Sequence, residues 1–210
     1  MIIVPFPEIL VPGNSRKISD CLLDDGVIAY PTDTLYGLGG NFFSRRAGEK
    51  IDAMKERNDQ PYSVAVGSLA MLESLVADIP EIFRLRLEKL LPGKFTFLFK
   101  PGPRIDPALL KDSGRIGIRI PGLKLLLKLI RRIELPLVST SANLSGRPPL
   151  NDPGRIARDF PAIDLLIDGG VLPPSLGSTV VDDTTTPPRI VRRGADVEKV
   201  LAALEGDGRG

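Results

Sequence analysis

Residues 115–141, RIGIRIPGLKLLLKLIRRIELPLVSTS, decide the fold of this chain. Arg115–Ile120 alternates isoleucine with arginine or glycine and predicts a strand, because successive strand side chains point to opposite faces. Leu123–Arg132 predicts a helix, and Leu135–Ser139 is again an apolar run of strand length. A strand, a helix and a strand in succession are typical of an α/β fold.

The rest of the chain continues this interleaving of strands and helices. Further strands are predicted at Val27–Pro31, Tyr62–Val66, Phe95–Phe99, Ile163–Ile167, Ser178–Val181 and Arg189–Val191. Helices are predicted from an N-cap at Ser15 to Gly26 and at Arg45–Glu56, Leu69–Val76, Ile82–Leu91 and Pro153–Asp159. We expect one α/β domain at residues 15–197, with an N-terminal extension (1–14) and a C-terminal tail (198–210).

The composition narrows the class of protein and the kind of site. The 210 residues include 28 basic and 26 acidic side chains, and the net charge of +2 excludes a protein that is polybasic throughout. There is no histidine and only one cysteine, which excludes a histidine general base, an internal disulfide and a thiolate zinc site. The N-terminus lacks the pattern of a secretory signal, and no stretch approaches about 18 apolar residues. We expect a cytoplasmic protein without membrane association.

Three strand-like segments carry hydroxyl, amide and guanidinium groups on alternate residues, where a buried strand would be apolar. A solvated sheet face usually mixes lysine, glutamate and threonine. These groups instead all donate hydrogen bonds to phosphate or carboxylate oxygens, which favours an anion-binding surface. The alternating residues are Arg115 and Arg119; Thr32, Thr34 and Tyr36; and Ser139, Ser141, Asn143 and Ser145.

Further cationic candidates lie outside these segments. Lys55 and Arg57 are expected near a helix C-terminus, and Arg192 precedes Arg193 and Gly194. Since the helix dipole alone favours cations at a C-terminus, the spacing of the first two leaves a binding and a structural interpretation open. No side chain among these candidates suits nucleophilic catalysis.

The common phosphate-binding and hydrolase motifs are absent from the sequence. Gly93-Lys94 is followed by phenylalanine and lacks the upstream glycine of a Walker loop. Gly37-Leu38-Gly39-Gly40 lacks the last glycine of a dinucleotide-binding loop, and no Gly-x-Ser-x-Gly occurs.

Seven segments, in this order along the chain, resemble the YrdC/Sua5 family, the threonylcarbamoyl-AMP synthases of tRNA modification. They are PTDTLYGLGGN, KER, LLPGKFTFLF, GIRIPG, STSANLSGRP, GSTVVD and IVRRG, and they lie within residues 15–195. The resemblance implies the short, single-domain type, with a twisted mixed sheet, helices packed on it and a concave, positively charged cavity. It also implies that L-threonine, bicarbonate and ATP, with Mg²⁺ held mainly by the triphosphate, give L-threonylcarbamoyladenylate and pyrophosphate. Partner proteins would then transfer the threonylcarbamoyl group to adenosine 37 of tRNA.

The resemblance also implies roles for individual residues. None is implied to be a covalent nucleophile or a metal ligand. Positioning and charge stabilisation would instead assist attack of a carbamate oxygen on the α-phosphate. These two roles would fall to Lys55, Arg57, Arg119 and Arg192. Threonine would be bound by Thr34, Arg119, Ser139 and Ser178, and ATP by Lys55, Arg57, Arg115, Ser141, Asn143 and Arg192.

Two other functions remain open on the sequence. YrdC-like domains also occur in the carbamoyl-adenylate-forming proteins of hydrogenase maturation, in which carbamoyl phosphate supplies the carbamoyl group. A basic concave face would also suit double-stranded RNA, with or without catalysis, although only 5% of the residues are aromatic. ATP cleavage that depends on threonine and bicarbonate separates the synthase from both.

Overall fold

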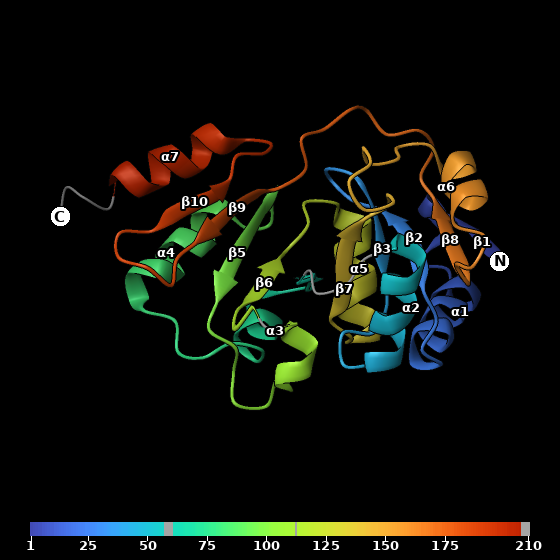
Figure 1. The fold of residues 1–210 in the computed structure, drawn as a ribbon, viewed down its shortest axis with the longest axis horizontal. Helices are drawn as coiled ribbons and strands as arrows, with labels where there is room; N and C mark the ends of the chain where they lie inside the picture. The colour runs from blue at the N-terminus through green and yellow to red at the C-terminus, as the bar shows by residue number, and fades with distance from the viewer. Residues whose placement is uncertain (57–60, 112, 207–210) are drawn as a thin grey trace.

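Ten strands form one twisted sheet in the computed structural model, which describes residues 1–56, 61–111 and 113–206 (Figure 1). Their order across the sheet is β1-β8-β2-β3-β7-β4-β6-β5-β9-β10. The strands are β1 (Ile2–Pro5), β2 (Ile28–Pro31), β3 (Tyr36–Gly39), β4 (Ser63–Ala65), β5 (Phe95–Phe99), β6 (Ile116–Arg119), β7 (Leu137–Ser141), β8 (Leu165–Asp168), β9 (Thr179–Asp182) and β10 (Arg189–Arg192). Parallel and antiparallel pairs both occur, so the sheet is mixed, as predicted.

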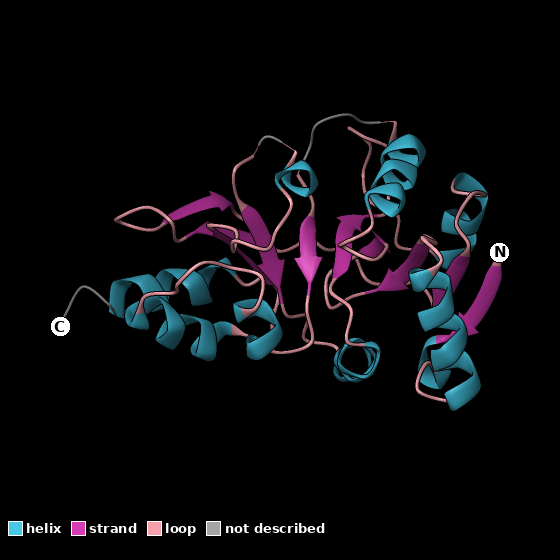
Figure 2. Cartoon of the chain, turned by 90° about the horizontal axis from the view of Figure 1, so that it is seen from below, coloured by secondary structure: helices cyan, strands magenta, loops and turns pink. Residues whose placement is uncertain are grey.

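Helices cover both faces of this sheet (Figure 2). The α-helices are α1 (Pro12–Leu23), α2 (Arg45–Lys55), α3 (Leu69–Glu73), α4 (Glu81–Leu90), α5 (Lys124–Ile133), α6 (Pro153–Asp159) and α7 (Val197–Gly206), and two 3₁₀ turns are η1 (Phe6–Glu8) and η2 (Pro107–Leu110). Across the described ranges, every helix is too short or too polar to span a lipid bilayer.

Buried side chains lie on both faces of the sheet because strand residues alternate between the two faces. On β2, Ile28 and Tyr30 belong to one cluster of these side chains and Ala29 to the other, and β8 divides in the same way. The cluster of Ile28 and Tyr30 includes residues of α1 and α5, while the cluster of Ala29 includes residues of α2, α4 and α6. Helices on both faces of a mixed sheet confirm the predicted α/β class.

Most predicted elements are confirmed, two of them residue for residue: the strand Phe95–Phe99 and the helix Pro153–Asp159. The N-cap at Ser15 is wrong, because α1 begins three residues earlier with Pro12 at its first position. Proline suits that position, since its fixed φ fits a helix and its missing N–H would have had no helical acceptor. The helix predicted over Leu69–Val76 is also too long, since α3 ends at Glu73.

Parts of the predicted N-terminal extension (1–14) and C-terminal tail (198–210) pair or pack with the rest of the described fold. β1 pairs in parallel with β8, and its Val4 is buried. At the other end, α7 packs against α4 and buries Val200, while residues 207–210 lie outside the described part. β1 was not predicted because a strand of four residues, the last of them proline, is too short to show the alternation of polar and apolar residues.

Candidate functional site

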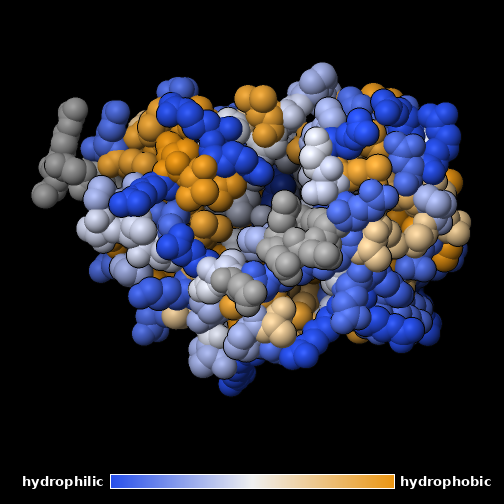
Figure 3. Space-filling view, viewed as in Figure 1, coloured by the Kyte–Doolittle hydropathy of each residue, from blue (hydrophilic) through white to orange (hydrophobic). Residues whose placement is uncertain are grey.

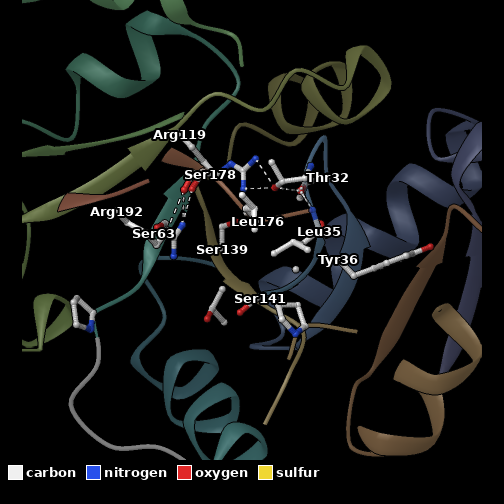
Figure 4. A pocket seen from close by; sticks show the side chains of 16 residues that line it. Thr32, Leu35, Tyr36, Ser63, Arg119, Ser139, Ser141, Leu176, Ser178 and Arg192 are labelled. Carbon is white, nitrogen blue, oxygen red and sulfur yellow. Dashed lines mark hydrogen bonds between the residues drawn. The ribbon is translucent and has the colours of Figure 1, made fainter. Parts of the chain in front are cut away.

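A cavity of about 300 Å³ brings together side chains that are far apart in the sequence. Residues of β3, β4, β6, β7 and β10 line it, together with loop residues (Figure 4). The surface is also hollowed near the middle of the molecule, where hydrophilic residues border the hollow (Figure 3). Six of the ten predicted site residues line the cavity: Thr34, Arg119, Ser139, Ser141, Ser178 and Arg192.

The register of the central strands explains why several of these residues share one face. Ser63 on β4 lies opposite Ser139 on β7 and opposite Gly117 on β6. Residues opposite one another point to the same side, and so do residues two apart on one strand. Arg119, two residues after Gly117, and Ser141, two residues after Ser139, therefore lie on the face of Ser63. The predicted alternation is confirmed for Ser139 and Ser141, but it is wrong for Asn143 and Ser145, because β7 ends at Ser141 and the chain turns after it.

The threonines of PTDT reach the cavity from a turn. Residues 32–35 join the antiparallel strands β2 and β3, so the prediction that Thr32, Thr34 and Tyr36 alternate along one strand is wrong. Thr32 Oγ1 accepts hydrogen bonds from the backbone N–H groups of Thr34 and Leu35, both at 3.2 Å, and donates to Leu35 O at 2.7 Å. Such side-chain-to-backbone bonds stabilise turns in competition with strands. They leave the Thr32 and Thr34 hydroxyl oxygens 3.1 Å apart beside the cavity.

Arg119 is buried in an ion pair that sequence reasoning missed. Its Nη2 donates to Asp33 Oδ1 at 2.5 Å, and Asp33 Oδ2 accepts from Gly122 N at 2.8 Å. Both Nη atoms also lie 3.4 Å from Thr34 Oγ1. Asp33 was missed because strand alternation placed it on the face opposite the threonines. Nε of Arg119 is buried without an acceptor among the described residues, an exception to the rule that buried donors are hydrogen-bonded.

Arg192 is the second guanidinium group in the cavity. It donates to the backbone oxygen of Ser178 from Nε at 3.1 Å and from Nη2 at 2.8 Å, and to Ser178 Oγ at 3.0 Å. Ser178 is buried, and its hydroxyl also lies 2.9 Å from Thr96 Oγ1. Burial, and then the positive charge of Arg119, lower the pKa of Arg192. Among the described residues, Asp33 is the single carboxylate partner of these two cations, and the remaining positive charge favours a bound anion.

Lys55 and Asn143 lie behind Ser141 and are not among the residues that line the cavity. The Lys55 side chain is buried, and its Nζ donates to Ser141 O, to Asn143 O at 2.7 Å and to Asn143 Oδ1 at 3.1 Å. Asn143 Oδ1 also accepts from Ser141 Oγ at 2.5 Å. Lys55 therefore fixes the loop that follows β7, and the ATP contacts predicted for Lys55 and Asn143 remain predictions.

The other predicted cations are not placed in the cavity. Arg115 precedes β6 by one residue and forms an ion pair with Asp182 on β9. It lies four residues, or about 13 Å along a strand, from Arg119. The structure therefore gives no support to its predicted contact with ATP. Arg57 lies outside the described residues. Within the described ranges, no group of three acidic or cysteine side chains is arranged to hold a metal ion.

Tyr36 fixes the segment that crosses from β8 towards the cavity. Its hydroxyl donates to Gly170 O at 2.8 Å and accepts from Gly169 N at 2.8 Å. Burial raises the pKa of Tyr36 to about 12, and burial also raises the pKa of Tyr30 above its usual value. Both phenols are therefore held in the neutral form.

We expect two of the three tyrosines to ionise only above pH 10 in the folded protein, whereas all three ionise at about pH 10 in the unfolded chain. Because folding raises these pKa values, their contribution to stability is complete below about pH 10. It is lost as the pH rises through the pKa of Tyr36 at about 12. Tyrosinate absorbance, followed during pH titration of native and urea-unfolded protein, measures the difference. Identical titrations would contradict the prediction.

Three comparisons with known proteins find relatives of the same kind. A family model described as "Telomere recombination", for the Sua5, YciO and YrdC proteins, matches residues 20–194. Threonylcarbamoyl-AMP synthases of Pyrococcus abyssi and Bacillus subtilis are 30% and 32% identical over 97% and 88% of this chain. The chain spans 62% and 54% of the length of these relatives. The crystal structure of P. abyssi Sua5 complexed with L-threonine superimposes with a TM-score of 0.86 at 29% identity, over 96% of this chain and 60% of that one.

Proposed function

The chain belongs to the Sua5/YciO/YrdC family, and from this premise we propose that it is an L-threonylcarbamoyladenylate synthase. Its substrates would be L-threonine, bicarbonate and ATP, and its products the adenylate and pyrophosphate. The observation that carries the proposal is the cavity where Arg119 and Arg192 meet the hydroxyl groups of Thr34, Ser139 and Ser178. The names of its relatives, and the threonine bound to P. abyssi Sua5, point to the same activity.

Threonine would occupy the buried end of the cavity. Arg119 would pair with its carboxylate, since the guanidinium is held by Asp33 and retains an unpartnered Nε. The hydroxyls of Thr34, Ser139 and Ser178 are all buried and all face the cavity, and they would donate to or accept from the amine and hydroxyl of threonine. Buried, fixed hydrogen-bonding groups of this kind reject ligands that leave them unpaired.

ATP would occupy the side of the cavity that Ser141 and Arg192 line. Arg192 forms no ion pair with any described residue, so its charge is available to the triphosphate. Ser141 is held in place by the Lys55 and Asn143 bonds described above. We propose that Mg²⁺ accompanies the nucleotide and is held mainly by its phosphate oxygens, where it would offset their charge.

The reaction would need no covalent enzyme intermediate. The threonine amine would add to CO₂ and release a proton, or would react with bicarbonate and release water, to give a carbamate. A carbamate oxygen would then attack the α-phosphorus, the bond from that phosphorus to the bridging oxygen would break, and pyrophosphate would leave. Fixed cations stabilise the charge of such a transfer. This makes the proposed enzyme a nucleotidyltransferase. Its product is a reactive mixed anhydride, so a partner enzyme would use it to modify adenosine 37 of tRNA.

Pyrophosphate release tests the proposal. We expect the protein to release pyrophosphate from ATP only when L-threonine and bicarbonate are both present, with formation of threonylcarbamoyladenylate measured by mass spectrometry. Reactions without an amino acid and without bicarbonate are the controls. ATP cleavage that requires carbamoyl phosphate would instead support the hydrogenase-maturation function. Salt-dependent binding of duplex RNA without any ATP cleavage would support an RNA-binding module.

A further inference from the structure

Two branched aliphatic side chains, Leu35 and Leu176, line a cavity whose other walls are mostly polar. Leu35 directly follows Thr34 in the β2–β3 turn, and Leu176 lies two residues before Ser178. Each leucine is therefore close in the sequence to a residue that the proposed function places around threonine. The prolines that also line the cavity, Pro61 and Pro149, come from the segments after Lys55 and Ser141, on the side proposed for ATP.

The backbone next to Leu176 passes close to Leu35. A β-carbon added at Gly177 would lie 3.4 Å from Leu35 Cδ1 and 3.7 Å from Arg192 Nη2, so the backbone beside Leu176 passes close to both. In Figure 4, Leu176 lies between Ser178 and Leu35. The apolar surface of the cavity is thus concentrated next to its buried hydroxyl groups.

Leu176 belongs to a strap, residues 169–177, that is fixed at both ends. Near its start, the backbone N–H of Leu172 donates to Asn151 O at 2.9 Å, and Asn151 Nδ2 donates to Leu172 O at 2.8 Å. At its end, Gly177 O accepts from Ala195 N at 2.8 Å. Leu176 is nevertheless 80% exposed although it lines the cavity. A ligand that covers this large exposed apolar side chain removes its surface from water, and this favours binding.

We propose, on the basis of the proposed function, that Leu35 and Leu176 contact the methyl group of threonine and select threonine over serine. With the threonine carboxylate on Arg119, the β-carbon substituents lie among Thr34, Ser178 and the two leucines. The hydroxyl then bonds to the buried oxygens, and the methyl group covers the leucines. Serine lacks this methyl group and would leave the leucines exposed to water. One methyl group in an apolar site is worth about 10- to 200-fold in selectivity at most.

Replacing Leu176 by alanine tests this proposal because an exposed residue is not expected to affect folding. We expect Leu176→Ala to lower kcat/KM for threonine about three- to tenfold, while kcat/KM for serine changes less than about twofold. Leu176→Met, which keeps the apolar volume, is expected to keep the selectivity of the wild type. Calorimetric titration of each variant with threonine and serine gives the same comparison without turnover.

Val171→Ala is the matched control. Val171 lies in the same strap and is 69% exposed, but it does not line the cavity, so neither substrate should be affected. An equal loss for threonine and serine in Leu176→Ala, no loss for either, or the same loss in Val171→Ala would overturn the selectivity proposal and leave the synthase function standing. Failure of the wild-type protein to bind threonine or to release pyrophosphate with it would overturn both.

Discussion

Replacing Arg119 by alanine is expected to lower the threonine-dependent kcat/KM about 10- to 150-fold. If Arg119 pairs with the substrate carboxylate as proposed, the substitution removes a charge-assisted hydrogen bond that contributes about 1.5–3 kcal/mol. It also leaves the Asp33 carboxylate, 9% exposed, without its ion-pair partner. Removing one member of a buried ion pair lowers the free energy of unfolding by about 3–5 kcal/mol. Steady-state kinetics with varied threonine, and urea unfolding of the same preparation, measure the two effects separately.

Arg86→Ala separates loss of the site from loss of stability. Arg86 on α4 forms an equally buried ion pair with Asp183, at 5% and 3% exposure, and does not line the cavity. We expect a similar destabilisation in this variant with an unchanged KM for threonine. The kcat/KM of Arg119→Lys for threonine should lie between those of the wild type and Arg119→Ala, since lysine keeps the charge but not the planar set of donors. Wild-type threonine kinetics in a folded Arg119→Ala protein would refute the role of this residue.

The sequence predicted the parts of the site that depend on strand alternation. Ser139 and Ser141 share a face because residues two apart on a strand point the same way, and this rule holds whichever strands are neighbours. Arg119 shares that face only because β6 and β7 both pair with β4 in the observed register. Alternation failed at Thr32, where hydroxyl-to-backbone bonds turn the chain, so it also hid the ion pair of Asp33 with Arg119. Long-range partners of this kind depend on which strands and turns meet, and local patterns do not contain that information.

The same limit applies to the cations outside the strands. The motif of Lys55 implies a contact with ATP, which stays a prediction; it did not indicate that the side chain donates to carbonyl oxygens about 90 residues later in the chain. Arg115 lies just before β6, four residues from Arg119, and pairs with Asp182. Residue type and spacing identified the groups that can bind anions. Only the fold decides which of them line the cavity and which stabilise the backbone around it.

The second large effect is expected for Lys55→Met, because one amino group holds Ser141, at the end of β7, and the loop that follows it. Methionine keeps most of the apolar stem but leaves the Ser141 and Asn143 oxygens without their charged donor. We expect the free energy of unfolding to fall by about 1.5–3 kcal/mol, the contribution of a hydrogen bond to a charged group. We expect a larger effect on catalysis, since a displacement of about 1 Å in a positioning group costs about 100-fold in rate. Measurement of kcat/KM for ATP, with urea unfolding beside it, tests both.

Two variants show whether Lys55 acts through the loop. Ser141→Ala removes one hydroxyl and leaves the lysine bonds to the backbone intact, so it should lower kcat/KM for ATP by only about three- to tenfold. Lys50→Met is the control on the same helix: Lys50 donates to Asp25 O at 2.8 Å, away from the cavity, and its loss should leave ATP kinetics unchanged. If Lys55→Met changes kcat/KM for ATP no more than Ser141→Ala does, the loop keeps its shape without the amino group. Lys55 would then be a core residue whose charge the reaction does not need.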